Sequence, residues 1–249
     1  MPRLMLTDEH WSKLKPIMLN AGIYDKSNLR TTVEGVLYKL RVGCPWRDLP
    51  QVFGRWNSVF KRFNYWSEKW RISDIFAEIS KVSDRDWTFV DGTIVKAHQH
   101  SSGAARGAES GIGKSVAGNT SKIHMAVDSF GLPFHFEITG GKVHDCKMAP
   151  ELVACILDVE WVIADKGYDS EALRNQIVEQ GGIAMIPRKE NSLKGNDDMD
   201  WGLYKYRHLV ENAFARLKHF RSIATRFEKL KRNYQSMVSL GCMIMWLPM

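Results

Sequence analysis

Residues 86–98, DWTFVDGTIVKAH, alternate apolar and polar side chains, which is the pattern of a half-buried β-strand. Downstream of this stretch, the sequence predicts a hairpin and then alternating helices and strands. The predicted ranges are 121–140 (hairpin, turning at 129–131), 147–157 (helix), 161–165 (strand), 170–182 (helix), 183–188 (strand) and 202–222 (long helix). Three strands followed by helix, strand, helix, strand and helix indicate an α/β fold, in which helices flank a mixed sheet.

The chain upstream of that first strand has helical periodicity instead. Thr7 is a predicted N-cap of a first helix. Residues 29–41 place apolar side chains at helical spacing, and Gly43 ends that helix. A further helix is predicted at residues 55–70, RWNSVFKRFNYWSEKW. The N-terminal third of the chain is therefore expected to be helical.

The helix predicted at residues 55–70 has three basic side chains beside an apolar, mostly aromatic stripe, namely Arg55, Lys61 and Arg62. A helix, a tight turn and a basic aromatic helix together are compatible with a helix-turn-helix reader of DNA. The alternative interpretation is a small helical bundle with an aromatic core. We expect an N-terminal helical DNA-binding domain at residues 1–84 and an α/β domain at residues 85–249.

The composition is that of an ordinary globular protein, with 249 residues, 44% of them hydrophobic and 25% charged. The longest apolar run, residues 237–247, is interrupted by Ser239 and Gly241 and is too short to span a bilayer, so we expect no membrane partner. The first residues lack the apolar stretch of a secretory signal. The four cysteines include no Cys-x-x-Cys pair, so free, buried thiols in a reducing cytoplasm are expected.

The net charge of +7 is concentrated in two segments. Residues 1–70 contain 12 Lys and Arg against 6 Asp and Glu, and residues 204–232 contain 9 against 2. The remainder is mildly acidic, with 14 against 20. Two basic segments suit a polyanion, most simply double-stranded DNA, because each neutralised phosphate releases counterions. Solvated helix faces are the alternative explanation.

Two short patterns suggest other sites but do not fit them. The tripeptide GKS at residues 113–115 lacks the earlier glycine of a phosphate-binding loop, because Ala108 stands at that position. It lies in a Gly- and Ser-rich stretch, residues 101–121, which we expect to form a mobile loop between the first two strands. Several histidines and a cysteine also lack the spacing of a zinc site. These are His98, His100, His144 and Cys146.

Two aspartates follow strand-like runs in matching contexts. Asp91 comes after WTFV and Asp165 after WVIA, and Gly92 and Gly167 follow them closely, leaving little bulk where a DNA backbone would approach. Carboxylates at strand ends of one sheet are well placed to meet. Cleavage of a phosphodiester with two metal ions needs such hard oxygen ligands a few ångströms apart. A turn or a helix cap is the alternative role for either aspartate alone.

The predicted long helix presents four polar side chains on one narrow face. At about 100° per residue, Arg207, Glu211 and Lys218 fall about 60°, 20° and 40° to the same side of Tyr204. One carboxylate among these groups suits a metal ligand surrounded by phosphate-binding side chains. The alternative is an ordinary helix ion pair between Arg207 and Glu211.

Three sequence boxes together resemble the signature of DDE transposases from bacterial insertion sequences. They are VDGT at residues 90–93, ADKGYDS at residues 164–170 and the spacing Y-x2-R-x3-E-x6-K from Tyr204 to Lys218. The last box matches the insertion-sequence-five family at every position, and residues 43–66 resemble the N-terminal domain of that family. The resemblance covers nearly the whole chain.

The resemblance implies that residues 85–249 form a ribonuclease-H-like catalytic domain. Asp91 would lie on its first strand, Asp165 on the fourth, and Glu211 on the helix after the fifth. This trio would hold two Mg²⁺ ions, or Mn²⁺ in their place. Asp145, in the segment VHDCKM, is a further candidate to assist the site.

The resemblance also implies the partners. Tyr204, Arg207 and Lys218 would hold phosphates at the ends of the mobile element. The DNA would be its terminal inverted repeats and target DNA, and the pairing of two ends implies at least a homodimer at the bacterial nucleoid. About 45 residues separate Asp165 from Glu211, which leaves no room for the large β insertion of some relatives. The route of second-strand cleavage therefore stays open.

Three functions are compatible with these observations. The first is an active transposase that cuts and rejoins DNA. The second is a transposase-derived DNA-binding protein without catalysis, against which the intact carboxylate trio argues, because a retired site has no physical reason to keep such groups together. The third is a stand-alone nuclease, which would cut DNA without joining it.

Overall fold

The computed structural model describes residues 2–101, 110–116, 118–156, 159–190 and 192–248. The chain forms two compact units. The first contains Met1–Lys81, Val95–Ser110 and Leu217–Met249, and the second contains Val82–Ile94 and Gly111–Arg216. The domain boundary that the sequence predicts between residues 84 and 85 stays a prediction.

The first unit is helical, as the sequence predicts for the N-terminal region. Its helices are α1 (Asp8–Asn20), α2 (Leu29–Val42), α3 (Trp56–Glu68), α4 (Arg71–Ile79), α9 (Arg221–Ala224) and α10 (Lys231–Trp246). The Thr7 hydroxyl accepts a hydrogen bond from the backbone N–H of His10 and caps α1, and Gly43 ends α2 with a φ of 72°. The last helix, α10, packs against α2, α3 and α4, so both ends of the sequence build this unit.

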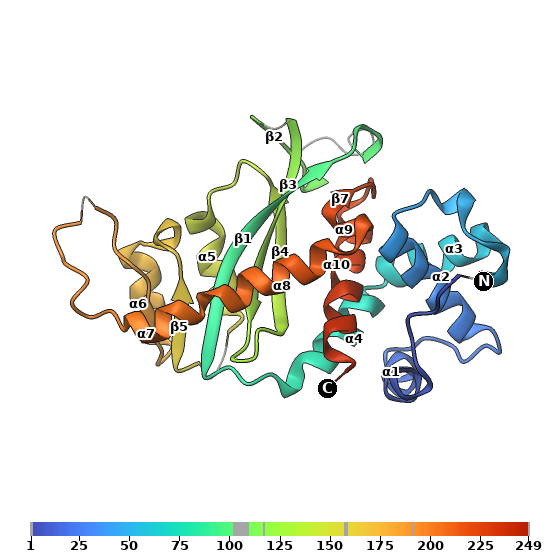
Figure 1. Ribbon diagram of the computed structural model, residues 1–249, viewed down its shortest axis with the longest axis horizontal. Helices are drawn as coiled ribbons and strands as arrows, with labels where there is room; N and C mark the ends of the chain where they lie inside the picture. Colours follow the sequence, from blue (N-terminus) through green and yellow to red (C-terminus); the bar gives the residue numbers. More distant parts are fainter. Residues whose placement is uncertain (1, 102–109, 117, 157–158, 191, 249) are drawn as a thin grey trace. The chain divides into compact units, whose positions relative to one another are not determined.

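The second unit is built on a mixed sheet (Figure 1). The strands of the sheet are β1 (Trp87–Ala97), β2 (Gly113–Ser115), β3 (Gly118–Val127), β4 (Pro133–Gly140), β5 (Trp161–Ala164), β6 (Ile183–Met185) and β7 (Thr225–Arg226). Of these, β7 and the last residues of β1, from Val95 on, belong to the first unit. Their order is β2-β3-β1-β5-β6, with β4 paired to β3 and β7 paired to the end of β1. The β3–β4 hairpin is antiparallel, whereas β1, β5 and β6 run parallel. The expected mixed sheet is confirmed.

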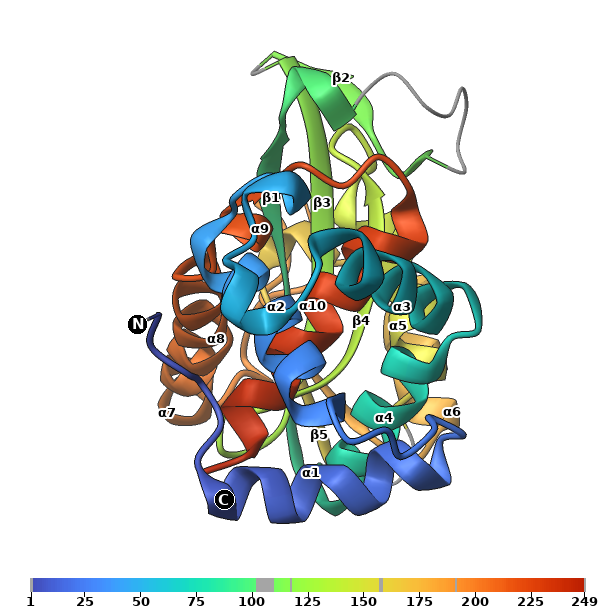
Figure 2. The same cartoon turned by 90° about the vertical axis from the view of Figure 1, so that its right-hand side faces the viewer.

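Helices cover both faces of this sheet (Figures 1 and 2). On one face, α5 (Asp145–Ala154) and α6 (Glu171–Glu179) enclose a core that includes Leu152 and Ile177, both buried. The opposite face carries α7 (Trp201–Tyr204) and α8 (His208–Lys218). Burial on both faces explains why β5, WVIA, is a short apolar run.

Three sequence predictions need correction. Asp91 does not end its strand, because β1 continues to Ala97, where it pairs with β7. Part of the predicted loop at residues 101–121 forms β2, so Asp165 follows the fifth strand rather than lying on the fourth; residues 102–109 and 117 of that loop lie outside the described residues. The predicted long helix is divided into α7, a 3₁₀ turn (Lys205–Arg207), α8 and α9.

The cysteines are free, as expected, but they differ in burial. Cys242 is buried, Cys44 and Cys146 are half-buried, and Cys155 is exposed, so the expectation of four buried thiols is wrong. Among the helices in the described part of the chain, none has the length and apolar character needed to cross a bilayer.

Candidate active site

Asp91 and Asp165 occupy equivalent positions with respect to the pairing of two neighbouring parallel strands, β1 and β5. The pairing of β1 with β5 ends with Val90 opposite Ala164, and each aspartate is the next residue along its own chain segment. One equal step beyond the last pair brings the two residues to the same edge of the paired region. The structure therefore brings these two predicted residues together, although β1 itself continues.

The Asp91 carboxyl is half-buried among other charged groups. Burial raises its pKa. The N–H of Gly92, 2.7 Å from Oδ1, and the charge of Arg207 lower the pKa, whereas the carboxylates of Asp165 and Asp145 raise it again. The net pKa lies above the ordinary aspartate value. Carboxylates crowded in this way favour a bound cation, which would relieve their repulsion.

Asp165 begins a 3₁₀ turn (Lys166–Tyr168) that it caps with its own side chain. Its Oδ1 accepts a hydrogen bond of 2.8 Å from the N–H of Gly167. A Cβ atom at Gly167 would lie 2.9 Å from that same oxygen. The turn therefore explains the glycine at position 167, and the cap orients the carboxylate of Asp165.

Arg207 joins two members of the predicted trio. Its Nη1 lies 3.0 Å from Oδ2 of Asp91, and its Nη2 forms a short hydrogen bond with Oε1 of Glu211, one helical turn further along. The helix ion pair between Arg207 and Glu211, which the sequence left as an alternative, is therefore present. It does not stand alone, because the same guanidinium also binds the sheet through Asp91.

Tyr204 belongs to the same neighbourhood. Burial raises the pKa of its phenol; the charge of Arg207 lowers the pKa, and the carboxylates of Asp165 and Asp91 raise it, with a net result above the ordinary value. Tyr204 therefore keeps its proton and can donate a hydrogen bond at neutral pH.

A second polar cluster surrounds Asp145, at the start of α5. Lys122 Nζ lies 3.1 Å from Asp145 Oδ2, and His124 Nδ1 lies 3.2 Å from Oδ1. His124 is fully buried, and its Nε2 is 2.9 Å from the hydroxyl of Thr139. Burial alone would raise the pKa of Asp145, but His124 and Lys122 outweigh it, so the net pKa is lowered. Asp145 is thus held as a carboxylate.

Gly92 is the point at which this cluster meets Asp91. A Cβ atom at Gly92 would lie 2.5 Å from Asp145 Oδ1 and 3.4 Å from the hydroxyl of Tyr168. Burial raises the pKa of that buried phenol, and the neighbouring Asp145, Asp91 and Asp165 raise it further. Tyr168 lies within the box ADKGYDS but was not among the predicted site residues. The absent side chain of Gly92 makes room for other side chains of the protein itself.

The donor chemistry of Asp91, Asp165 and Glu211 fits a divalent metal ion, because all three offer the hard oxygen ligands that Mg²⁺ prefers. Within the described ranges, however, no three His, Cys, Asp or Glu side chains form a group that could hold a metal ion. Arg207 supplies the positive charge between Asp91 and Glu211. The histidines and the cysteine that the sequence analysis rejected as zinc ligands form no such group in these ranges either.

The other predicted DNA-binding residues lie in the first unit. Arg55 and Lys61 of the α3 region are exposed. Arg62 is half-buried, and its guanidinium donates to the side chains of Asn28 and Thr32 at 2.9 and 2.7 Å, which gives it a role within the helical unit. Lys218 ends α8 and is exposed.

Two family models match the chain. The model described as "Transposase DDE domain" matches residues 83–247, about two thirds of the chain. The model described as "Putative transposase of IS4/5 family" matches residues 6–76. The two matches together cover both the helical N-terminal region and the segments that contain the predicted carboxylate trio.

Curated relatives carry related names. The chain is 36% identical over 128 residues to a putative transposase for insertion sequence element IS6501 from Brucella ovis, covering 51% of this chain and 98% of the relative. It is 33% identical over 138 residues to a putative transposase for IS402 from Burkholderia cepacia, covering 51% and 63% of the two chains. These alignments therefore span about half of this chain.

Two solved structures are distantly similar. A piggyBac transposase synaptic complex with hairpin DNA has a TM-score of 0.38 at 11% identity, and the match covers 78% of this chain and 45% of that chain. The Mos1 transposase paired-end complex with left transposon end has a TM-score of 0.28 at 8% identity, with 78% and 79% covered.

Proposed function

The chain belongs to the DDE transposase family of bacterial insertion sequences, and we propose that it binds the terminal inverted repeats of its own element and catalyses strand cleavage and strand transfer. In the first step, water attacks the phosphodiester at the element's end. A new bond forms between the water oxygen and phosphorus, and the bond to the 3′ oxygen breaks and leaves a 3′-hydroxyl. That hydroxyl then attacks a phosphodiester of target DNA: its oxygen bonds to the target phosphorus, and the bond from that phosphorus to the target's 3′ oxygen breaks and leaves a 3′-hydroxyl on the target strand.

One observation carries this proposal. Asp91 and Asp165 stand one equal step beyond the last residue pair of two parallel strands, and Arg207 links Asp91 to Glu211. Three carboxylates far apart in the sequence are thus connected through one sheet edge and one helix. Structural ion pairs also perturb carboxylates, but a half-buried group of like charges is a frequent sign of a functional site.

Asp91, Asp165 and Glu211 would hold two Mg²⁺ ions, or Mn²⁺ in their place. These ions would supply Lewis-acid polarisation of the phosphate and lower the pKa of water. Because Arg207 contacts Asp91 Oδ2 and Glu211 Oε1, metal binding would compete with it for these oxygens. We expect the Arg207 side chain to leave these carboxylates and to bind a DNA phosphate instead. The planar guanidinium can donate two parallel N–H hydrogen bonds to a phosphate.

The remaining side chains would bind DNA. The protonated phenol of Tyr204 would donate to a phosphate oxygen, and Lys218, Arg55 and Lys61 would neutralise phosphates elsewhere along the duplex. Arg62 would contribute less, because it is already engaged with Asn28 and Thr32. We assign DNA binding to residues 1–84 and catalysis to residues 85–249, and we expect at least a dimer on paired ends.

The test uses a supercoiled plasmid that contains this gene with its flanking DNA. Purified protein is added with Mg²⁺, Mn²⁺ or Ca²⁺, beside the variants Asp91→Asn, Asp165→Asn and Glu211→Gln. Glu179→Gln, an exposed carboxylate of α6, is the control. We expect cuts at the two element ends with Mg²⁺ or Mn²⁺, unchanged in the control and absent in the three variants, which should still bind the ends.

Other outcomes would favour the alternatives. End binding without cuts in any metal would favour a transposase-derived DNA-binding protein without catalysis. Cuts without joined products would favour a nuclease. If one of the three variants still cuts, its residue does not belong to the site.

A further inference from the structure

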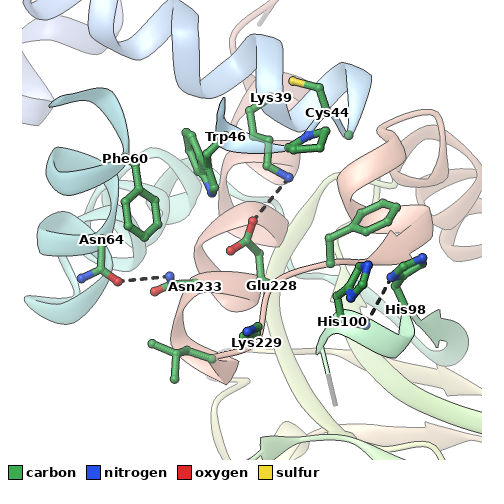
Figure 3. Close-up of a pocket in the computed structure, with 14 residues that line it drawn as sticks. Lys39, Cys44, Trp46, Phe60, Asn64, His98, His100, Glu228, Lys229 and Asn233 are labelled. Carbon is green, nitrogen blue, oxygen red and sulfur yellow. Dashed lines mark hydrogen bonds and ion pairs between the residues drawn. The ribbon is translucent and has the colours of Figure 1, made fainter. Parts of the chain in front are cut away.

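The buried ion pair of the first unit is satisfied within that unit. Lys39 and Glu228 border a cavity (Figure 3), and the Lys39 ammonium also lies 5.7 Å from the ring centres of Trp46 and Phe227. The buried polar group of the second unit differs from this pair, because it borders the candidate active site.

This group of the second unit, which we call the Asp145 cluster, consists of Lys122, His124, Asp145 and Tyr168. Lys122 and His124 come from β3, Asp145 is the first residue of α5, and Tyr168 ends the 3₁₀ turn after β5. His124 and Tyr168 are buried, whereas the side chains of Lys122 and Asp145 are 11% and 29% exposed. Side chains from three elements that meet in this way can fix the elements relative to one another.

Both carboxylate oxygens of Asp145 are engaged inside the cluster. Lys122 Nζ lies 3.1 Å from Oδ2 and 3.3 Å from Oδ1, and His124 Nδ1 lies 3.2 Å from Oδ1. The hydroxyl of Thr139, 2.9 Å from His124 Nε2, holds the other side of the imidazole. A metal ion at Asp145 would have to displace an ammonium from these oxygens. Asp145 is therefore better suited to hold its neighbours in place than to bind metal directly.

The cluster closes around the backbone that carries Asp91. A Cβ atom at Gly92 would lie 2.5 Å from Asp145 Oδ1 and 3.4 Å from both His124 Nδ1 and the Tyr168 hydroxyl. The N–H of the same Gly92 donates to Asp91 Oδ1 at 2.7 Å. A shift of the cluster would therefore move the peptide that orients the Asp91 carboxylate.

The cluster also holds the segment that carries Asp165. The backbone N–H of Tyr168 donates to the backbone oxygen of Asp165 at 3.1 Å and closes the 3₁₀ turn that Asp165 begins. The pairing of β1 with β5 ends with Val90 opposite Ala164, one residue before each aspartate. Beyond that pair, the packing of Tyr168 near Gly92 takes the place of strand pairing.

We propose that the Asp145 cluster is a positioning device that fixes the separation of Asp91 and Asp165, without itself binding metal or DNA. Two metal ions about 3.5–4 Å apart need carboxylates held at a defined distance. Removing a partner that orients a metal-binding side chain typically weakens metal binding by about 10–100-fold. This inference rests on the proposed function, and it adds residues whose loss acts through the two aspartates.

Tyr168 allows a positioning role to be separated from a role in folding. Within the described residues, its buried hydroxyl has no hydrogen-bond partner, so removing the hydroxyl should cost little stability. Burial and the nearby carboxylates of Asp145, Asp91 and Asp165 raise the pKa of this phenol. It therefore stays protonated, as a neutral donor among three carboxylates. Tyr168→Phe removes this donor and keeps the ring.

Tyr234 of the first unit provides the matched control. It is also buried, but its hydroxyl donates to the backbone oxygen of Ile223 at 2.9 Å. Tyr234→Phe should therefore lower the urea midpoint of unfolding and leave metal affinity unchanged. Tyr168→Phe should keep the midpoint and weaken metal binding. The two variants remove the same atom from a buried phenol and are expected to give opposite results.

Isothermal titration calorimetry with Mn²⁺ measures the metal affinity. It is applied first to the free protein and then to its complex with a duplex that ends at the mapped element terminus. We expect the dissociation constant to rise about tenfold in Tyr168→Phe. Cleavage at a series of Mn²⁺ concentrations should show the same shift in half-saturation, with a rate at saturating Mn²⁺ within about threefold of the parent rate.

Asp145→Asn tests whether Asp145 positions the aspartates or binds metal directly. We expect the dissociation constant for Mn²⁺ to rise about tenfold or more, while the number of ions bound per chain stays that of the parent. Circular dichroism verifies that the variant is folded. If Asp145→Asn unfolds, Tyr168→Phe still tests the inference.

Other results would overturn the inference. If Tyr168→Phe binds Mn²⁺ as tightly as the parent, the cluster does not set the two aspartates. If its unfolding midpoint falls as far as that of Tyr234→Phe, the phenol has a structural role. Loss of one bound ion in Asp145→Asn would make Asp145 a ligand. All three results leave the proposed function intact, whereas a parent protein that binds no Mn²⁺ in either state would remove both.

Discussion

Each of the two units contains a cation paired with a carboxylate, but the pairs differ in their access to water. In the first unit, Lys39 Nζ lies 3.4 Å from Glu228 Oε1, and the side chains are 3% and 9% exposed. In the second, the side chain of Arg207 is 22% exposed, and those of its partners Asp91 and Glu211 are 19% and 52% exposed. The first pair is almost dry, whereas the second is open to solvent.

This difference separates a pair that holds the fold from a pair that can exchange partners. Charges removed from water cannot be separated without leaving one of them unpaired, so the Lys39–Glu228 pair is fixed once the unit has folded. A half-exposed pair loses less when it opens, because water replaces the lost partner. Arg207 is therefore free to leave its carboxylates for a phosphate at modest cost.

The substitution Lys39→Met should have the largest effect on stability. It leaves the buried Glu228 without its cation, and we expect the free energy of unfolding to fall by about 3–5 kcal/mol, measured by urea unfolding. The double variant Lys39→Met/Glu228→Gln should recover part of the loss. The control is Arg30→Met, which breaks the exposed pair with Asp8 and should cost about 0–1 kcal/mol. Equal losses for the two cations would remove the contrast between the units.

Arg207→Gln should show the opposite behaviour. We expect its unfolding free energy to change by less than about 1 kcal/mol, while DNA cleavage falls about 10²–10³-fold through the loss of a charged donor. Single-turnover cleavage of a labelled element end measures the rate, and urea unfolding measures the stability. Arg207→Lys should restore little activity, because an ammonium cannot bridge two partners as a guanidinium does. A stability loss as large as that of Lys39→Met would make Arg207 a structural residue.

Gly92→Ala sharpens the comparison at the meeting point of the two carboxylate clusters. The added Cβ would lie 2.5 Å from Asp145 Oδ1, so a side chain must shift, and we expect a loss of about 1–3 kcal/mol together with weaker cleavage. Gly195→Ala is the control, because its Cβ would make an ordinary contact of 3.4 Å with Asp197. An Ala variant as stable and active as the parent would show that Asp145 moves away freely.

The smallest expected effect is that of Asp169 on how the free energy of unfolding depends on pH. Burial raises its pKa, but the N–H of Lys189 and the guanidinium of Arg174 outweigh burial and hold the pKa below the ordinary value. Because the folded pKa lies below the unfolded one, the ionised group stabilises the fold above about pH 4, and this contribution is lost as the pH falls through the folded pKa.

We expect Asp169→Asn to lower the unfolding free energy by about 1.5 kcal/mol at neutral pH and to flatten its decline in acid. Urea unfolding at a series of pH values measures both. The exposed carboxylate of Glu190 is the control, as Glu190→Gln. If the parent and Asp169→Asn lose stability in parallel as the pH falls, the ion pair with Arg174 does not control the acid response.

Local signals made much of the fold predictable. Ser170 accepts a hydrogen bond from Leu173 N at the start of α6, and the β3–β4 hairpin turns at the predicted residues. Both features depend on residues close in sequence. The alternation of residues 86–98 also predicted the length of β1, whereas the pairing of its last residues with Thr225 and Arg226, far along the chain, was not predictable.

The candidate site shows the same limit. The alternation of β3 places Lys122 and His124 on one side of the strand, but nothing local indicates that Asp145 joins them. The shared helix face of Arg207 and Glu211 follows from helical spacing, whereas the contact of Arg207 with Asp91 does not. The predicted helix face shared by Tyr204, Arg207, Glu211 and Lys218 was only approximate, because a 3₁₀ turn interrupts the helix between Tyr204 and α8.

The packing of α10 against α2, α3 and α4 has a consequence for biosynthesis. Tyr234, Met237 and Val238 of α10 are fully buried, so the N-terminal helices leave the ribosome with an apolar surface that only the last part of the chain can cover. They must wait until α10, Lys231–Trp246, has been translated. The second unit ends at Arg216 and can close earlier, so we expect truncated products to contain a folded sheet and an unfinished helical unit.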